Sequence, residues 1–199
     1  MTHKSRTLSF ILVALCCVAA ASGVRDAGAT PSATGLSVMP AQAHNRQAEQ
    51  QVSAGIEAKK KGDAVSAEAH YREAIRLDPS YAEPHYDLGI LFAERGQTEQ
   101  AIAEYKKAIG IDKDYAEAHF NLGVLLDKKG DLNGEIKEYQ RAIQSAPNYA
   151  NAHYNLANAL VKRGAYDGAV EQFQIYLRLS PKAKDRKQVE ELIAKLHGS

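Results

Sequence analysis

Cysteine is almost absent from this 199-residue sequence, and the two that occur are adjacent. Cys16 and Cys17 both lie inside an apolar run near the start of the chain. If that run is removed during export, the remaining protein has no cysteine, which excludes disulfides and a cysteine nucleophile. The folded part must then be held together by packing and polar contacts alone.

The sequence also lacks an excess of either charge. Lys and Arg together number 25 against 24 for Asp and Glu, giving a formal net charge of +1. Without a basic patch the chain has no electrostatic footprint for nucleic acid, and we expect no nucleic-acid partner. The shares of hydrophobic residues (45%) and charged residues (25%) are ordinary, which favours a folded soluble protein over a disordered one.

No apolar run is long enough to be an ordinary membrane-spanning helix, which needs about 20 residues. The longest uncharged stretch, Leu8 to Ala21, follows basic residues at 3, 4 and 6 and ends at small residues. This order is typical of a secretory signal, predicted here at 1–23. We therefore expect an exported protein, periplasmic or secreted. The alternative is an uncleaved N-terminal anchor, and only in that case is a membrane a partner.

Residues 24–46 are rich in Ala, Ser, Thr, Gly and Pro, and they offer few side chains that could bury a helical face. Pro31 and Pro40 interrupt any helix there. We predict a flexible linker.

The motifs of common enzymes are missing as well. The chain contains no G-x-S-x-G, no H-E-x-x-H and no phosphate-binding glycine loop. We predict a protein that is not an enzyme, with no cofactor and no small-molecule substrate.

What the sequence does contain is a repeat of 34 residues. HYDLG at 85–89 recurs as HFNLG at 119–123 and HYNLA at 153–157, and EYKKAI at 104–109 recurs as EYQRAI at 138–143. An earlier copy lacks the His but keeps the glycine, alanine and tyrosine positions. Self-similarity at a fixed period indicates a repeat architecture. Four copies fill 47–183, at 48–81, 82–115, 116–149 and 150–183.

Each copy has apolar residues at helical spacing in two runs, separated by a glycine near the middle. The unit is therefore helix, tight turn, helix, and the fold is all-α. Gly89, Gly123 and Ala157 share one repeat position, which predicts a close crossing of the two helices. Glu135 stands where the other copies have alanine. Because a carboxylate at a tight crossing is costly, we expect the second helix of the third copy to start late or pack loosely.

These residues resemble the pattern of the tetratricopeptide-repeat family, which has an aromatic residue, Leu-Gly, then aromatic and alanine positions at fixed spacing. In the second copy it is carried by His85, Leu88, Gly89, Ala101 and Tyr105. The resemblance implies an α-solenoid of four units. A charged helix at 184–199 with one apolar stripe is interpreted as a C-terminal capping helix; its alternative role is dimerisation.

Three histidines, His85, His119 and His153, invite a metal hypothesis. Equivalent residues in stacked repeats lie about 8–10 Å apart, whereas one ion needs its ligand nitrogens at ~2 Å. No second ligand recurs with them. We interpret these histidines as structural and predict no metal site.

The resemblance implies that first helices line the concave face of the solenoid. There the sequence places an aromatic stripe beside a polar stripe, with a third row one turn further on. Aromatic rings provide contact area at little entropic cost, and amides bond to a peptide backbone in both directions. The predicted groove residues are Tyr86, Asp87, Ile90, Phe120, Asn121, Val124, Tyr154, Asn155 and Asn158. The alternative is that the same residues only stabilise the stack.

The sequence thus favours an exported, non-catalytic scaffold or adaptor that binds a protein or peptide segment in the groove. Because Glu49, Glu83 and Glu117 accompany that face, a neutral or basic segment suits it better than an anionic one. The alternative function is structural: a self-associating or membrane-tethered assembly component, possible as a homo-oligomer.

Overall fold

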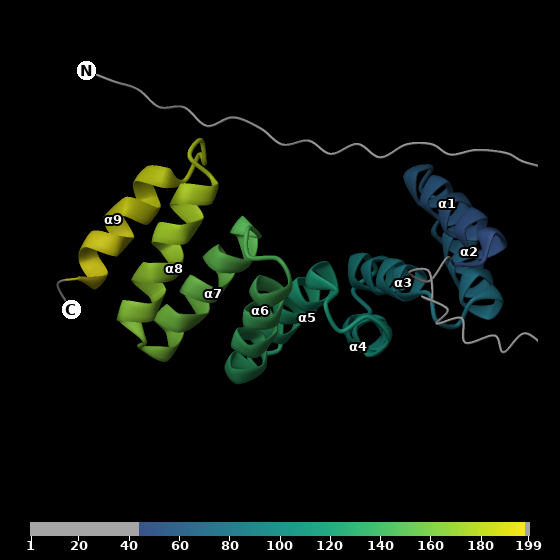
Figure 1. Cartoon of the computed structure of the whole chain (residues 1–199), viewed down its shortest axis with the longest axis horizontal. Helices are drawn as coiled ribbons and strands as arrows, with labels where there is room; N and C mark the ends of the chain where they lie inside the picture. Colours follow the sequence, from purple (N-terminus) through teal and green to yellow (C-terminus); the bar gives the residue numbers. More distant parts are fainter. Residues whose placement is uncertain (1–43, 198–199) are drawn as a thin grey trace, which may run out of the picture. The chain divides into compact units, whose positions relative to one another are not determined.

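The computed structural model describes residues 44–197, and this part of the chain is a succession of α-helices without strands (Figure 1). The predicted signal at 1–23 and the linker up to residue 43 lie outside it. Within 44–197, no helix is long and apolar enough to cross a membrane. The helices are α1 (Arg46–Lys60), α2 (Ala64–Leu77), α3 (Ala82–Glu94), α4 (Thr98–Ile111), α5 (Ala116–Lys128), α6 (Leu132–Ser145), α7 (Ala150–Arg163), α8 (Tyr166–Leu179) and α9 (Arg186–Leu196).

The first eight helices form four pairs, and each helix packs against the next one along the chain. Inside each pair the turn is made by a glycine with a positive φ between +74° and +81°. Only glycine adopts this left-handed conformation without strain. The four turn glycines, Gly62, Gly96, Gly130 and Gly164, are each 34 residues apart. The helix-turn-helix unit and the α-solenoid fold expected from the sequence are confirmed.

The two helices of a pair cross where a small residue meets an aromatic ring. A Cβ atom added to Gly123 would lie 2.7 Å from Cε1 of Tyr139, and one added to Gly89 would lie 2.5 Å from the ring of Tyr105. In the fourth pair, Ala157 replaces the glycine. The facing ring there is Phe173, which is fully buried. These crossings form the interior of each repeat.

The expectation for the third repeat was wrong. Helix α6 begins at Leu132, the position equivalent to Thr98 in α4, so it does not start late. Glu135 is nevertheless only 2% exposed. Burial, with Asp127 nearby, raises the pKa of Glu135, and Nζ of Lys162 lies 3.5 Å from its Oε1. Lys162 belongs to the next repeat, and its charge allows the Glu135 carboxyl group to lie at the helix crossing without a later start of α6.

Helix α9 covers the end of the stack. Val189 is 3% exposed, and the apolar residues of α9 pack with those of α8. The hydroxyl of Tyr176 donates to Asp185 at 2.8 Å, and Arg186 donates to the carbonyl of Leu177 at 2.9 Å. Because α9 buries one apolar stripe and leaves a charged side exposed, it has the form that a terminal cap needs.

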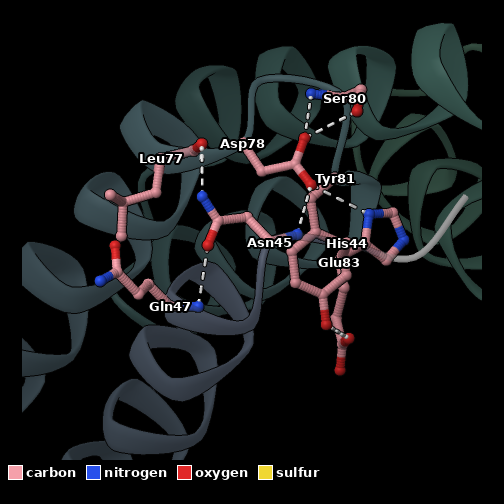
Figure 2. A network of polar contacts seen from close by, with 8 residues as sticks. All are labelled: His44, Asn45, Gln47, Leu77, Asp78, Ser80, Tyr81 and Glu83. Atoms are coloured by element: carbon pink, nitrogen blue, oxygen red, sulfur yellow. Dashed lines mark hydrogen bonds and ion pairs between the residues drawn. The ribbon is translucent and has the colours of Figure 1, made fainter.

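The opposite end of the stack is held by polar contacts around Asp78, at the end of α2 (Figure 2). Its Oδ2 accepts from the backbone of Asn45, the N-cap of α1, at 3.3 Å and lies 3.2 Å from Nδ1 of His44. Ser80 donates its hydroxyl to Oδ1 at 2.7 Å, which keeps the pKa of Asp78 below its ordinary value. The His44 ring stacks on Tyr81 with centroids 4.0 Å apart. The described end of the predicted linker, residues 44–46, therefore belongs to the first repeat.

Candidate binding surface on the first helices

The nine predicted groove residues all lie on first helices of the repeats, three each on α3, α5 and α7, and all are half-buried. Within each helix they occupy positions i, i+1 and i+4 or their equivalent, so they share one side. We call this set the first-helix face. It consists of Tyr86, Asp87 and Ile90 on α3, Phe120, Asn121 and Val124 on α5, and Tyr154, Asn155 and Asn158 on α7.

The aromatic residues of this face are part of the packing between repeats. Tyr86 contacts Tyr105 of α4 at 5.9 Å and Tyr115, the N-cap of α5, at 4.9 Å. Phe120 contacts Tyr139 and Tyr149 at the same two distances. At these centroid separations the pairs stabilise the stack beyond the area they bury. All three aromatic residues nevertheless remain partly exposed.

Sequence reasoning missed a tyrosine that recurs at the last position of the first three repeats: Tyr115 and Tyr149 support this stripe, whereas Tyr81 stacks on His44. Tyr81, Tyr115 and Tyr149 immediately precede α3, α5 and α7 and recur at the 34-residue spacing, a signal that could have found them. Tyr154 contacts Tyr176 of α8 instead, at 5.0 Å. Removing the three face aromatics would therefore disturb repeat packing, so they make poor probes of binding alone.

The asparagines of the face are anchored by tyrosine hydroxyls and backbone. Nδ2 of Asn121 donates to the Tyr86 hydroxyl at 3.2 Å, and Nδ2 of Asn155 donates to that of Tyr139 at 3.4 Å. Nδ2 of Asn158 donates to the carbonyl oxygen of Tyr154 at 3.0 Å. Each bond uses one of the two amide hydrogens and holds the side chain in place. The remaining hydrogen and the carbonyl oxygen can serve an external group.

Two of these asparagines line a cavity of about 390 Å³ between the third and fourth repeats. Charged groups contribute to its wall: Lys162 bridges to Asp127 at 2.5 Å, and Nζ of Lys162 lies 3.5 Å from Oε1 of Glu135. The lining residues are Asp127, Glu135, Tyr139, Asn155, Asn158, Val161 and Lys162. A recess of this composition accepts a polar side chain better than an apolar one.

Asp87 differs from its equivalents, because it presents a carboxyl group where the next two repeats present amides. Its Oδ2 atom is buried and has no hydrogen-bond partner among the described residues. Burial, together with the charge of Glu83, raises the pKa of Asp87 to about 7. The carboxyl group is therefore the least satisfied polar group of the face.

The three histidines considered for a metal instead bind a polar residue across their own helix pair. Nδ1 of His85 donates to Glu104 at 2.7 Å, and Nδ1 of His119 donates to Glu138 at 2.7 Å. Among the described residues there is no group of three or more potential metal ligands. The first repeat has the same kind of contact, but there the histidine lies on the second helix and its partner on the first. The remaining pairs are Gln51 with His70 at 2.7 Å and His153 with Gln172 at 2.8 Å.

His119 has acceptors at both ring nitrogens, since Nε2 lies 3.1 Å from the carbonyl oxygen of Lys113. Both nitrogens must donate, which requires the protonated ring. Burial is the largest single effect and opposes the charge, but the hydrogen bonds to Glu138 and Lys113 and the charge of Glu138 together outweigh it and raise the pKa of His119 above its ordinary value. This pair therefore stabilises the fold fully below pH 6.5, and its contribution is lost as the pH rises through the raised pKa.

Glu138→Gln is expected to lower the pKa of His119, because the substitution removes the anion and leaves the burial. The measurement is an NMR titration of the His119 ring proton. Glu171→Gln, at an exposed position of α8, is the control that should leave the midpoint unchanged. An unchanged midpoint in Glu138→Gln would contradict the assigned pairing.

Comparison with known proteins extends these observations. No curated protein sequence matches the chain. Among solved structures, the crystal structure of MamA protein matches with 26% identity and a TM-score of 0.67, over 76% of this chain and 83% of the other. A tetratricopeptide repeat protein from Parabacteroides merdae has 20% identity and a TM-score of 0.67, over 77% and 61%. The O-GlcNAc transferase of Thermobaculum terrenum, as a mutant, has 25% identity and a TM-score of 0.56, over 66% of this chain but 26% of the enzyme.

The family comparison identifies the repeats themselves. A family model described as TPR repeat matches residues 59–94, 91–130 and 126–164. Together these segments run from 59 to 164, which is 106 of 199 residues. Repeats of this kind act in general as scaffolds for protein interaction. The chain belongs to the TPR repeat family.

Proposed function

We propose that this protein is an exported, non-catalytic scaffold that binds a peptide or helical segment of another protein along the first-helix face. Family membership supports a protein-interaction role in general. The choice of face rests on one observation: three consecutive repeats hold an amide or carboxyl group at the same position, each beside a half-buried aromatic ring.

The arrangement of polar groups favours a partner segment whose backbone forms the hydrogen bonds with the asparagines. Asn121 and Asn155 are held by tyrosine hydroxyls, so little further side-chain entropy is lost when they bond to a ligand. Successive amides at one repeat position form a row that follows the stack. A partner that lies along the row meets an aromatic residue in each of these repeats, beside a carboxyl group in the second and an amide in the third and fourth, which gives affinity with modest sequence preference.

The test uses the full chain as bait in extracts of its own cells. In the variant Asn121→Ala, Asn155→Ala, Asn158→Ala the amides are removed and the aromatic packing stays. The matched control is Gln100→Ala, Gln140→Ala, Gln174→Ala, at exposed positions of α4, α6 and α8. We expect a partner that is retained by the control and lost by the amide variant. Partners bound equally by both variants would place the function on another surface.

A second candidate function is a structural one, in which copies of the chain self-associate or are tethered to a membrane. It is favoured by the apolar stretch Leu8–Ala21, which serves as an anchor if it is not cleaved. Mass spectrometry of the protein from its own cells decides the matter of cleavage, and sedimentation over a range of concentrations decides self-association. Cleavage near residue 23 with a monomer throughout would exclude this candidate and support export.

A further inference from the structure

Asp87 departs from a repeated pattern in which the equivalent side chains have hydrogen-bond partners within the fold. Its equivalents Asn121 and Asn155 each donate an amide hydrogen to a tyrosine hydroxyl. A carboxylate has no hydrogen to donate, and the buried Oδ2 of Asp87 has no partner in residues 44–197. Leaving such a group unsatisfied destabilises a fold. A position that keeps an unsatisfied acceptor in place of a fitting amide is a candidate for contact with an external donor.

The charged groups around Asp87 leave it without a cation of its own. Glu83, one turn earlier on α3, adds to the negative charge. The lysine that acts on Asp87 from α1 is Lys59, and its Nζ is bound to Glu94 at 2.8 Å. The other ionisable neighbours are tyrosines: Tyr71 of α2, Tyr81 before α3, Tyr86 of α3, Tyr105 of α4, and Tyr115 before α5. Within residues 44–197, the one cation that acts on Asp87 is therefore already paired with another carboxylate.

We propose that Asp87 receives a lysine or arginine side chain of the bound segment, an inference that rests on the proposed function of the first-helix face. The ammonium or guanidinium group would donate to the carboxylate in a charge-assisted hydrogen bond, for which the Asp87 side chain must turn its buried Oδ2 toward the face. The half-buried rings of Tyr86 and Tyr115, themselves 4.9 Å apart, suit the aliphatic stem and the cation. Glu83 adds attraction for a cation and repels an anionic segment.

This binding depends on pH in a definite direction. The cation requires the ionised form of Asp87, whereas burial holds the pKa of the free group at about 7. A bound cation stabilises the ionised form and lowers that pKa. Affinity for a basic segment is therefore highest above pH 7 and falls as the pH drops below it, and binding at pH 7 releases at most about half a proton.

The first experiment reads the site without any assumption about the partner. The Asp87 carboxyl carbon in the labelled full chain is assigned by its loss in Asp87→Asn and titrated by NMR. The titration is repeated with N-acetyl-lysine methylamide and with N-acetyl-norleucine methylamide, which has no charge. The lysine probe is expected to lower the midpoint by about one pH unit at saturation, while the norleucine probe leaves it unchanged. Equal midpoints with both probes would overturn the inference.

A second experiment separates this inference from the proposed function. Short extended peptides with central Lys, Arg, Gln or Glu and degenerate flanks are bound to the wild-type chain and to Asp87→Asn. We expect about a tenfold preference of the wild type for Lys or Arg over Gln, absent from the variant. Peptides bound without that preference would refute the role of Asp87 and leave the proposed function standing. No peptide bound by either chain would overturn the proposed function itself.

Discussion

Replacing Gly123 by alanine is expected to lower the free energy of unfolding by about 1–2 kcal/mol, although alanine is the better helix former. In a helix the change gains about 0.5–1 kcal/mol. The new methyl group, however, would lie 2.7 Å and 2.8 Å from two ring carbons of Tyr139. That ring is 2% exposed and is in contact with Phe120, so it cannot swing away. Overpacking of this kind costs about 1–3 kcal/mol, which is more than the gain from the better helix propensity of alanine.

The matched control is Gly110→Ala in α4, where nothing lies within 4 Å of the added methyl group. Thermal or urea unfolding should show this variant to be more stable than the wild type by about 0.5–1 kcal/mol. Adding Tyr139→Phe to Gly123→Ala should recover part of the loss, because it recreates the pair made by Ala157 and Phe173 and frees the ring from Asn155. If Gly123→Ala and Gly110→Ala were equally stabilising, the crossing would not be as close as described.

Asp87→Asn is expected to make the free protein more stable at pH 8 by about 1–3 kcal/mol, the usual cost of an unsatisfied buried polar group. Asn155, at the equivalent position, donates to the hydroxyl of Tyr139. Tyr139 lies 16 positions before Asn155, and Tyr71 lies 16 positions before residue 87. By the same geometry we expect the new amide to donate to the hydroxyl of Tyr71. A substitution that improves the fold while it weakens the binding of a basic segment is the mark of a residue kept for function.

The gain should depend on pH. Burial raises the pKa of Asp87 from 3.8 to about 7 in the folded chain, so the folded state holds this proton more tightly than the unfolded state does. The wild type therefore loses stability as the pH rises from about 4 to about 7, and the asparagine variant does not lose this part. Urea unfolding of both proteins at several pH values measures the gap. A gap that is the same at pH 5 and pH 8 would contradict the burial of an ionising carboxyl group.

The repeat unit was predictable because its positions carry strong local signals. Glycine at the turn, glycine or alanine at the crossing and apolar residues at helical spacing recur every 34 residues, and each has one physical reason to be there. Glu135 was the exception. The lysine that accommodates it, Lys162, is 27 positions away in another repeat, and contacts between repeats leave no local pattern.

The candidate site was only partly accessible from the sequence, for a similar reason. Periodicity put the nine residues on one face, but it could not separate packing from exposure. Tyr86 and Phe120 were predicted as contact surface, and the structure adds the neighbouring rings of Tyr115 and Tyr149 that occupy much of them. The exchanged pair of Gln51 and His70 was also missed, because a swap between two helices preserves the contact while it breaks the sequence repeat.

The central claim is that a partner lies along the first-helix face, and site-specific photo-crosslinking in living cells tests it most directly. A photoreactive residue replaces Asn158 on α7 in one version of the full chain and Gln140, exposed on α6, in another. The account predicts a discrete crosslinked partner from position 158 that is absent from position 140. Adducts from position 140 alone, or the same adducts from both positions, would contradict it.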